Sequence, residues 1–139
     1  MIKQLNQAIS IGDQAKAKEI ANLIEDLDTV DEQDVSPLMC AAGCEDYALC
    51  LYLIKQGADV NLQNTSGSTA LHMAVLESVA NAILSDNKLG NENTSIVSAL
   101  LEKGANPYLV DSLGHSAIDI ANDSESEILL SVLTKVSEQ

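Results

Sequence analysis

Apolar residues recur along this chain in short groups with helical spacing, and polar turns separate the groups. Over 5–9 and 17–24 the apolar positions fall three or four residues apart, on either side of a Gly-Asp turn at 12–13. A similar arrangement returns at the far end, over 117–121 and 128–136. Such spacing places the apolar side chains on one face of each helix. The pattern predicts a pair of short helices at each end of the chain.

Two stretches in the middle of the chain repeat each other at a fixed distance. The sequence SPLMCAA at 36–42 returns 33 residues later as TALHMAV at 69–75. The first is followed by LIKQGADVN at 53–61 and the second by LLEKGANP at 100–107. Self-similarity at a fixed period is typical of repeat proteins, in which stacked helical units share one continuous core. The chain is therefore predicted to be a short repeat array.

The second of these repeats contains an insertion. Gly57 and Gly104 occupy equivalent positions but lie 47 residues apart, which is 14 more than the 33-residue period. The extra residues are roughly 78–91. We expect 79–84 to extend the preceding helix and 85–91 to form an exposed loop, because the second half is rich in Asn, Gly and Ser. This loop is either a neutral insertion, which costs little stability, or a recognition loop.

The turns between repeats also follow a pattern. Gly67 and Gly114 suit the positive φ of a tight turn, and Asp34 stands at the equivalent position of the first turn. Ser36 and Thr69 come directly before helical segments, where a side-chain oxygen can cap the helix. These residues predict that each unit begins with a turn followed at once by a capped helix.

Together these residues resemble the ankyrin repeat, whose pattern is a turn, T-P-L-H-x-A-A, two helices and G-A-D/N-x-N. Residues 34–66 and 67–110 match it closely, and 1–33 and 111–139 match it more loosely as terminal caps. The resemblance implies an all-α solenoid of about four helix-turn-helix units, which form a single domain over 1–139. It also implies that the histidine of the motif, His72, bonds the backbone of a neighbouring turn and ties adjacent repeats together.

Composition and charge narrow the possible partners. Of the 139 residues 46% are hydrophobic, yet Phe and Trp are absent, so the core should be aliphatic and alanine-rich. There are 21 acidic residues against seven lysines and no arginine, and the net charge is −14. A chain of this sign should be repelled by nucleic acids and by anionic membranes, and we expect neither as a partner. The charge favours a basic protein partner, or else it serves only solubility.

The chain also carries signals about its location. We find no segment with the pattern of a signal peptide or of a membrane span, and the three cysteines lack the spacing of a disulfide framework. We expect reduced thiols in a cytoplasm, which could be that of a host cell after export.

Both terminal units have polar outer faces, which favours a monomer.

Cys40, His72 and Asp119 invite a catalytic interpretation as nucleophile, base and acid. The ankyrin pattern already explains His72, and Cys40 and Cys50 fall at apolar positions where cysteine acts as a small buried hydrophobe. A small thiol hydrolase that uses Cys44 and His72 is a remote alternative. The cysteines and histidines lack the spacing of zinc ligands, and no glycine-rich phosphate-binding motif occurs. We therefore expect no catalytic site, no metal and no cofactor.

A binding surface remains as the expected site of function. In ankyrin repeats the turn tips and the exposed side of the first helices line a concave groove that holds other proteins. Six acidic residues fall within 25–34 without a lysine, which predicts a negative edge of this groove. Carried over by the repeat alignment, the predicted partner-binding residues are Asp31, Glu32, Gln33, Val35, Cys44, Thr65, Ser66, Ser68, Leu76, Glu77, Ser112, Leu113, His115 and Asp123.

These features favour a non-enzymatic protein-binding module with a basic partner. The most specific hypothesis is an immunity protein or antitoxin that covers a basic toxin, because opposite charge speeds association and steric cover stops activity. The alternative within the same class is a scaffold or accessory protein for a cellular enzyme, including a secreted factor that engages host proteins.

Overall fold

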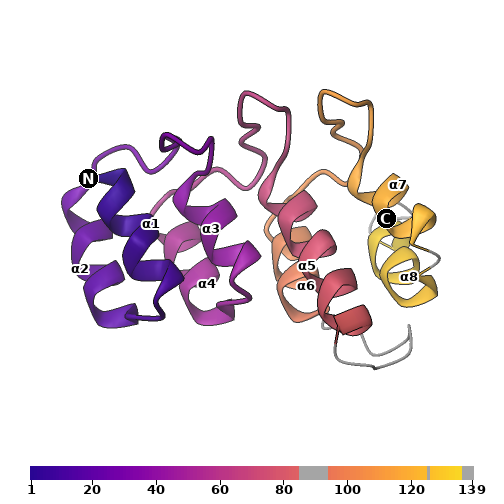
Figure 1. Cartoon of the computed structure of the whole chain (residues 1–139), viewed down its shortest axis with the longest axis horizontal. Helices are drawn as coiled ribbons and strands as arrows, with labels where there is room; N and C mark the ends of the chain where they lie inside the picture. Colours follow the sequence, from indigo (N-terminus) through magenta and orange to yellow (C-terminus); the bar gives the residue numbers. More distant parts are fainter. Residues whose placement is uncertain (85–93, 125, 136–139) are drawn as a thin grey trace.

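The computed structural model of the chain describes residues 1–84, 94–124 and 126–135. Within these ranges the regular elements are α-helices alone, as predicted (Figure 1). The eight helices are α1 (Ile2–Ser10), α2 (Gln14–Leu23), α3 (Pro37–Gly43), α4 (Tyr47–Lys55), α5 (Ala70–Leu84), α6 (Ser95–Glu102), α7 (Ala117–Asp123) and α8 (Glu127–Lys135).

The helices pack in pairs that follow the chain order, and the pairs stack side by side. α1 packs on α2, α3 on α4, α5 on α6 and α7 on α8. Between pairs, α1, α3, α5 and α7 contact one another in one row, and α2, α4, α6 and α8 form a second row. The long loops that precede α3, α5 and α7 extend on the same side of the stack (Figure 1). The result is a solenoid with loops along one edge.

Aliphatic side chains fill the space between the two rows, as the apolar pattern predicts. Leu5 and Ile9 of α1 are buried, and so are Leu49 and Leu53 of α4. Many of the remaining core positions are alanines, such as Ala41 and Ala42 of α3, which are fully buried. Small side chains let neighbouring helices approach closely, and the core therefore needs neither Phe nor Trp.

Polar side chains cap the starts of several helices, including α3 and α7. The Ser36 hydroxyl accepts a hydrogen bond from the Met39 N–H at 3.2 Å, and Pro37 takes the first helical position of α3. Ser116 and Asp119 form a reciprocal capping box at the start of α7. Side-chain caps satisfy N–H groups that have no partner inside the helix, so the start of each of these helices is fixed by its own sequence.

Three loops with the same hydrogen-bond pattern join the pairs, and we call them the first finger (31–35), the second finger (64–68) and the third finger (111–115). In each finger the first residue donates its N–H to the carbonyl of the last, at 2.9 to 3.0 Å. The fourth residue of each finger has positive φ: Asp34 at 65°, Gly67 at 77° and Gly114 at 82°. The left-handed conformation predicted for Asp34 is confirmed.

The insertion lengthens one helix. α5 has 15 residues and continues to Leu84, whereas the equivalent helix α3 has seven. This confirms that 79–84 extends the helix that begins the unit. The loop predicted over 85–91 lies outside the described residues.

Candidate functional site

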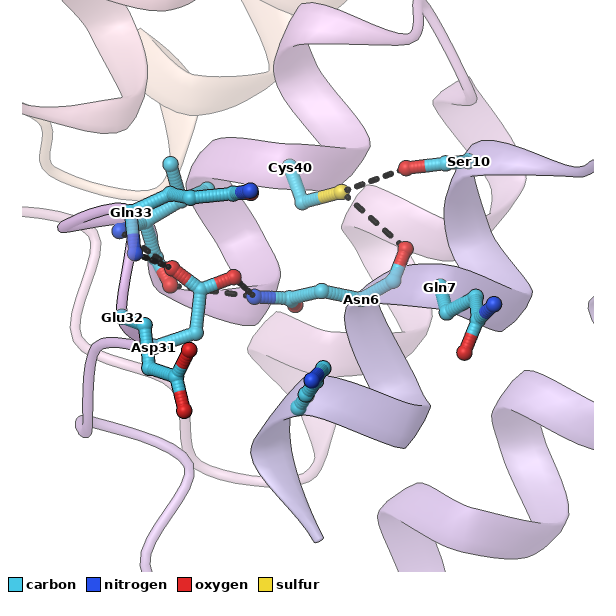
Figure 2. A pocket seen from close by; sticks show the side chains of 9 residues that line it. Asn6, Gln7, Ser10, Asp31, Glu32, Gln33 and Cys40 are labelled. Atoms are coloured by element: carbon cyan, nitrogen blue, oxygen red, sulfur yellow. Dashed lines mark hydrogen bonds between the residues drawn. The ribbon is translucent and has the colours of Figure 1, made fainter.

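The first finger, α1 and α3 enclose a pocket of about 410 Å³ (Figure 2). Four predicted binding residues of the first finger, Asp31, Glu32, Gln33 and Val35, lie in its wall. A volume of this size falls in the range of ligand-binding pockets. We call it the first-finger pocket, and its lining residues are Lys3, Asn6, Gln7, Ser10, Asp31, Glu32, Gln33, Val35 and Cys40.

Asp31 shapes the first finger by accepting backbone hydrogen bonds. Its Oδ1 accepts from the N–H of Gln33 at 2.8 Å and from the N–H of Val35 at 3.1 Å. Its Oδ2 accepts from the side-chain amide of Asn6 at 2.9 Å. Partial burial acts to raise the pKa of Asp31, but the hydrogen bonds from Asn6, Val35 and Gln33 outweigh it and hold the pKa below its usual value. The pocket therefore has an ionised carboxylate in its wall at neutral pH.

The contribution of α1 to this pocket is not among the features expected from the sequence. Asn6 is 5% exposed, and its amide reaches from α1 to the first finger, where it donates to the Val35 carbonyl at 3.0 Å as well as to Asp31. The repeat spacing could have revealed this role. Asn6 lies two 33-residue periods before His72 and therefore occupies the same position in the motif. The degenerate sequence of 1–33 obscured this equivalence.

The first two fingers are bonded to each other through Asp34. Its carboxylate accepts hydrogen bonds from the N–H of Thr65 at 2.9 Å and from the N–H and hydroxyl of Ser66 at 3.2 and 3.0 Å. Asn64 donates its side-chain amide to the Asp34 carbonyl at 2.8 Å. The backbone N–H of Thr65 is the main cause of a lowered pKa at Asp34. Thr65 and Ser66, two predicted partner-binding residues, therefore also hold the fingers together.

The third finger is hydrogen-bonded to the second in turn. The Ser112 N–H donates to the Ser66 carbonyl at 2.8 Å, and Gln63 donates its amide to the Val110 carbonyl at 3.0 Å. Leu113, at the tip, is 77% exposed, and His115 is exposed as well. The fingers thus present the predicted residues Ser66, Ser112, Leu113 and His115 along one bonded edge.

Four of the remaining predicted residues lie on or at the end of a helix, and Ser68 lies in the second finger. Cys44 caps the C-terminal end of α3, which is the end remote from the finger that precedes this helix, and it is exposed. Leu76 in α5 is 50% exposed and Glu77 is half-buried. Asp123 ends α7 and is exposed, and Ser68 is half-buried at the end of the second finger. The first-finger pocket brings together only the four residues of its own finger.

His72 has the structural role that the ankyrin pattern implies. Its Nδ1 accepts from the Thr69 N–H at 3.1 Å and lies 2.8 Å from the Thr69 hydroxyl, while its Nε2 lies 2.9 Å from the His115 carbonyl. Because the Thr69 N–H can only donate, Nδ1 carries no proton and Nε2 is the donor to His115. The ring is 2% exposed. Both nitrogens are engaged within the fold, so His72 is not free to act as the base that the thiol-hydrolase alternative requires.

Cys40, predicted to be a small buried hydrophobe, packs against the core but is only partly buried, because its side chain lies in the wall of the first-finger pocket. Its Sγ lies 3.5 Å from the Ser10 hydroxyl and 3.5 Å from the Asn6 carbonyl. Burial is the main cause that raises the pKa of Cys40 to about 11 and that of the fully buried Cys50 to about 12. Both are therefore protonated thiols at neutral pH, which are poor nucleophiles.

In the part of the chain that the structure describes, we find no group of three or more His, Cys, Asp and Glu side chains placed to hold a metal ion. Likewise, none of the described helices has the length and apolar composition that a membrane span requires.

Comparison with known proteins places this fold in a family. The family model of ankyrin repeats in three copies matches residues 5–90. An ankyrin repeat-containing protein of Treponema pallidum is 34% identical over 87 residues, which are 63% of this chain and 24% of that protein. The phosphocholine transferase AnkX of Legionella pneumophila is 28% identical over an alignment that covers 94% of this chain and 16% of the enzyme. The chain thus spans a quarter or less of the length of these relatives.

Solved structures agree with the sequence matches. The ankyrin repeat domain of Bcl-3, a member of the IκB protein family, superposes with a TM-score of 0.72 at 25% identity and covers 94% of this chain and 50% of that one. An ankyrin repeat domain from Acinetobacter baumannii gives a TM-score of 0.78 at 23% identity, with coverage of 96% and 63%. Ankyrin repeats form protein–protein interaction modules, generally without catalytic activity. The chain belongs to the ankyrin repeat family.

Proposed function

We propose that this ankyrin repeat domain binds a basic protein along the edge formed by its three fingers, with the first finger as the main contact. The observation that carries the proposal is the concentration of six acidic residues and no lysine over 25–34, next to a pocket whose own aspartate is held ionised. Like charges this close repel one another, and a basic partner relieves that repulsion. Charge complementarity of this kind speeds association and excludes acidic competitors.

The six acids divide into two groups with different roles. The four aspartates accept hydrogen bonds within the fold; the Asp28 carboxylate, for example, accepts from the Asp59 N–H at 2.8 Å. Glu25 and Glu32 are exposed. The aspartates therefore set the loop conformation and supply fixed negative charge, while the two glutamates are the groups best placed to contact a partner directly.

Within this class we propose an inhibitor of the immunity or antitoxin type, acting as a monomer in a cytoplasm by covering the active surface of a basic toxin. High negative charge supports this role, since inhibition by steric cover needs a complementary surface and a fast encounter. The scaffold alternative places the same surface on a basic region of a cellular enzyme. An adjacent toxin gene in the native genome would favour the inhibitor.

The test compares two double variants that carry the same net charge. Glu25→Gln with Glu32→Gln removes the two exposed glutamates of 25–34, whereas Glu19→Gln with Glu102→Gln removes two exposed glutamates of α2 and α6. Each protein is immobilised to capture proteins from the native host's lysate. Captured proteins are then purified and titrated by calorimetry at about 50 and 300 mM salt, where exposed charges are screened to different extents.

The proposal predicts a basic partner whose Kd rises with salt and rises about three- to tenfold in the first variant, with little change in the second. A partner that is acidic, or that binds both variants equally at both salt concentrations, would contradict it. Loss of the partner in both variants to the same extent would assign binding to overall charge and reject the first finger as the main contact.

A further inference from the structure

The first-finger pocket has a charge suited to one monovalent cation. Three charged side chains line it: Asp31 and Glu32 contribute two negative charges and Lys3 contributes one positive charge, which leaves −1. Asp31 is fixed by its hydrogen bonds to the finger backbone, whereas Glu32 and Lys3 are exposed. A single guanidinium or ammonium group would therefore neutralise the pocket.

The amide of Asn6 supplies an acceptor that the fold leaves unused. Its Nδ2 donates to Asp31 Oδ2 and to the Val35 carbonyl, so both amide hydrogens are engaged (Figure 2). Neither partner atom can donate in return, which fixes the orientation of the amide. The Oδ1 atom is buried and receives no hydrogen bond from any described residue. A buried acceptor without a donor is unfavourable, so a donor brought by a ligand gains an interaction that the free protein lacks.

The third unit shows what is missing at this position. In that unit His72 donates through Nε2 to the His115 carbonyl of the third finger, just as Asn6 donates to the Val35 carbonyl of the first finger. The other ring nitrogen of His72 accepts a hydrogen bond from Thr69. In the 33-residue repeat Lys3 stands at the position of Thr69. The first unit therefore keeps the bond to its finger through Asn6 but has lost the threonine hydroxyl, and the unpaired acceptor lies in a residue that lines a pocket.

We propose that the first-finger pocket receives an arginine side chain of the protein partner. This inference rests on the proposed function and specifies the chemistry by which the partner is recognised. A guanidinium is planar and brings five N–H donors, which suit the acceptors of the lining residues. These acceptors are the carboxylates of Asp31 and Glu32 and the Oδ1 atom of Asn6, which is buried in the free protein and must be uncovered as the guanidinium enters. A lysine ammonium is a compact point charge and satisfies fewer such separated acceptors.

The test titrates the whole chain with three short capped peptides that differ only at their central residue, which is arginine, lysine or citrulline. Citrulline keeps the shape of arginine but carries no charge, and a carbonyl oxygen replaces one of its NH2 groups, which removes two N–H donors. Binding is followed by ¹H–¹⁵N NMR at the Asn6 side-chain amide and at the backbone amides of Gln33 and Val35. The variant Glu32→Gln is compared with Glu19→Gln, which changes the net charge equally but lies on α2 outside the pocket.

We expect saturable shifts at Asn6, Gln33 and Val35 with the arginine peptide. Binding should be at least tenfold weaker with citrulline and about threefold weaker in the Glu32→Gln variant. Equal binding of the lysine peptide would overturn the assignment of a guanidinium. Equal binding of the citrulline peptide, or shifts confined to residues outside the pocket, would overturn the pocket as the site. Either failure leaves the proposed function standing if the basic partner still depends on Glu25 and Glu32.

Discussion

His72 is the side chain whose loss should do most damage to the link between the third and fourth units. It is 2% exposed, its Nδ1 accepts from Thr69, and its Nε2 donates to His115. In the His72→Ala variant, the loss of each of these two hydrogen bonds lowers the free energy of unfolding by about 1 kcal/mol. Truncation of the buried ring adds about 1–3 kcal/mol for lost packing and the cavity left behind. The expected decrease in the free energy of unfolding is therefore about 3–5 kcal/mol.

The chain itself supplies the matched variant, His72→Asn. Asn6 occupies the equivalent position and bonds the Val35 carbonyl at 3.0 Å, so an asparagine at 72 can keep the bond to His115. We expect it to cost about 1–2 kcal/mol, mainly through lost packing. Urea unfolding followed by far-ultraviolet circular dichroism measures both values. A decrease in the free energy of unfolding below about 1 kcal/mol for His72→Ala, or equal decreases for the two variants, would refute the role of His72 in linking the third and fourth units.

Three further predictions concern the fingers and the thiols. Gly67→Ala should destabilise the chain more than Gly114→Ala in thermal unfolding. Both residues have positive φ, but only at Gly67 would a Cβ lie 2.8 Å from a backbone carbon of the third finger; equal losses would contradict this. Because the folded pKa of Asp34 lies below the usual 3.8, its stabilisation is present above that value and lost as the pH falls through the folded pKa. The urea midpoint should therefore fall in acid less steeply for Asp34→Asn than for the wild type, and parallel profiles would exclude this role. In mass spectrometry after iodoacetamide treatment, Cys44 should be alkylated in the folded chain and Cys50 only after unfolding, since Cys50 is buried and its pKa is about 12. Early alkylation of Cys50 would contradict its burial.

The periodic features of this fold could be predicted from the sequence because they depend on local residues. The 33-residue repeat, the glycine turns, the caps and the extension of α5 to Leu84 each follow from residues close together in the chain. The left-handed conformation of Asp34 also followed, because its position matches Gly67 and an aspartate tolerates positive φ. The resemblance of 34–66 and 67–110 to one motif then determined how the units stack.

The candidate site could be predicted only in part, because its decisive contacts join distant residues. Asn6 bonds Asp31 across 25 positions, and Asp34 bonds Ser66 across 32. The acidic run was interpreted from composition as a charged surface, yet its aspartates are engaged in hydrogen bonds that shape the first finger and its neighbours. The partial exposure of Cys40 could not be predicted for the same reason, since the pocket beside it is formed by the first finger and by α1.

The bonds that run from finger to finger have a consequence for the cost of binding. Asp34 holds Thr65 and Ser66, and the Ser66 carbonyl holds Ser112, so the tips are already ordered in the free protein. A partner that docks on these tips has little backbone entropy to remove, and a larger share of its contact energy remains as affinity. Loops are usually the most mobile parts of a fold, but these three fingers act as a preorganised template.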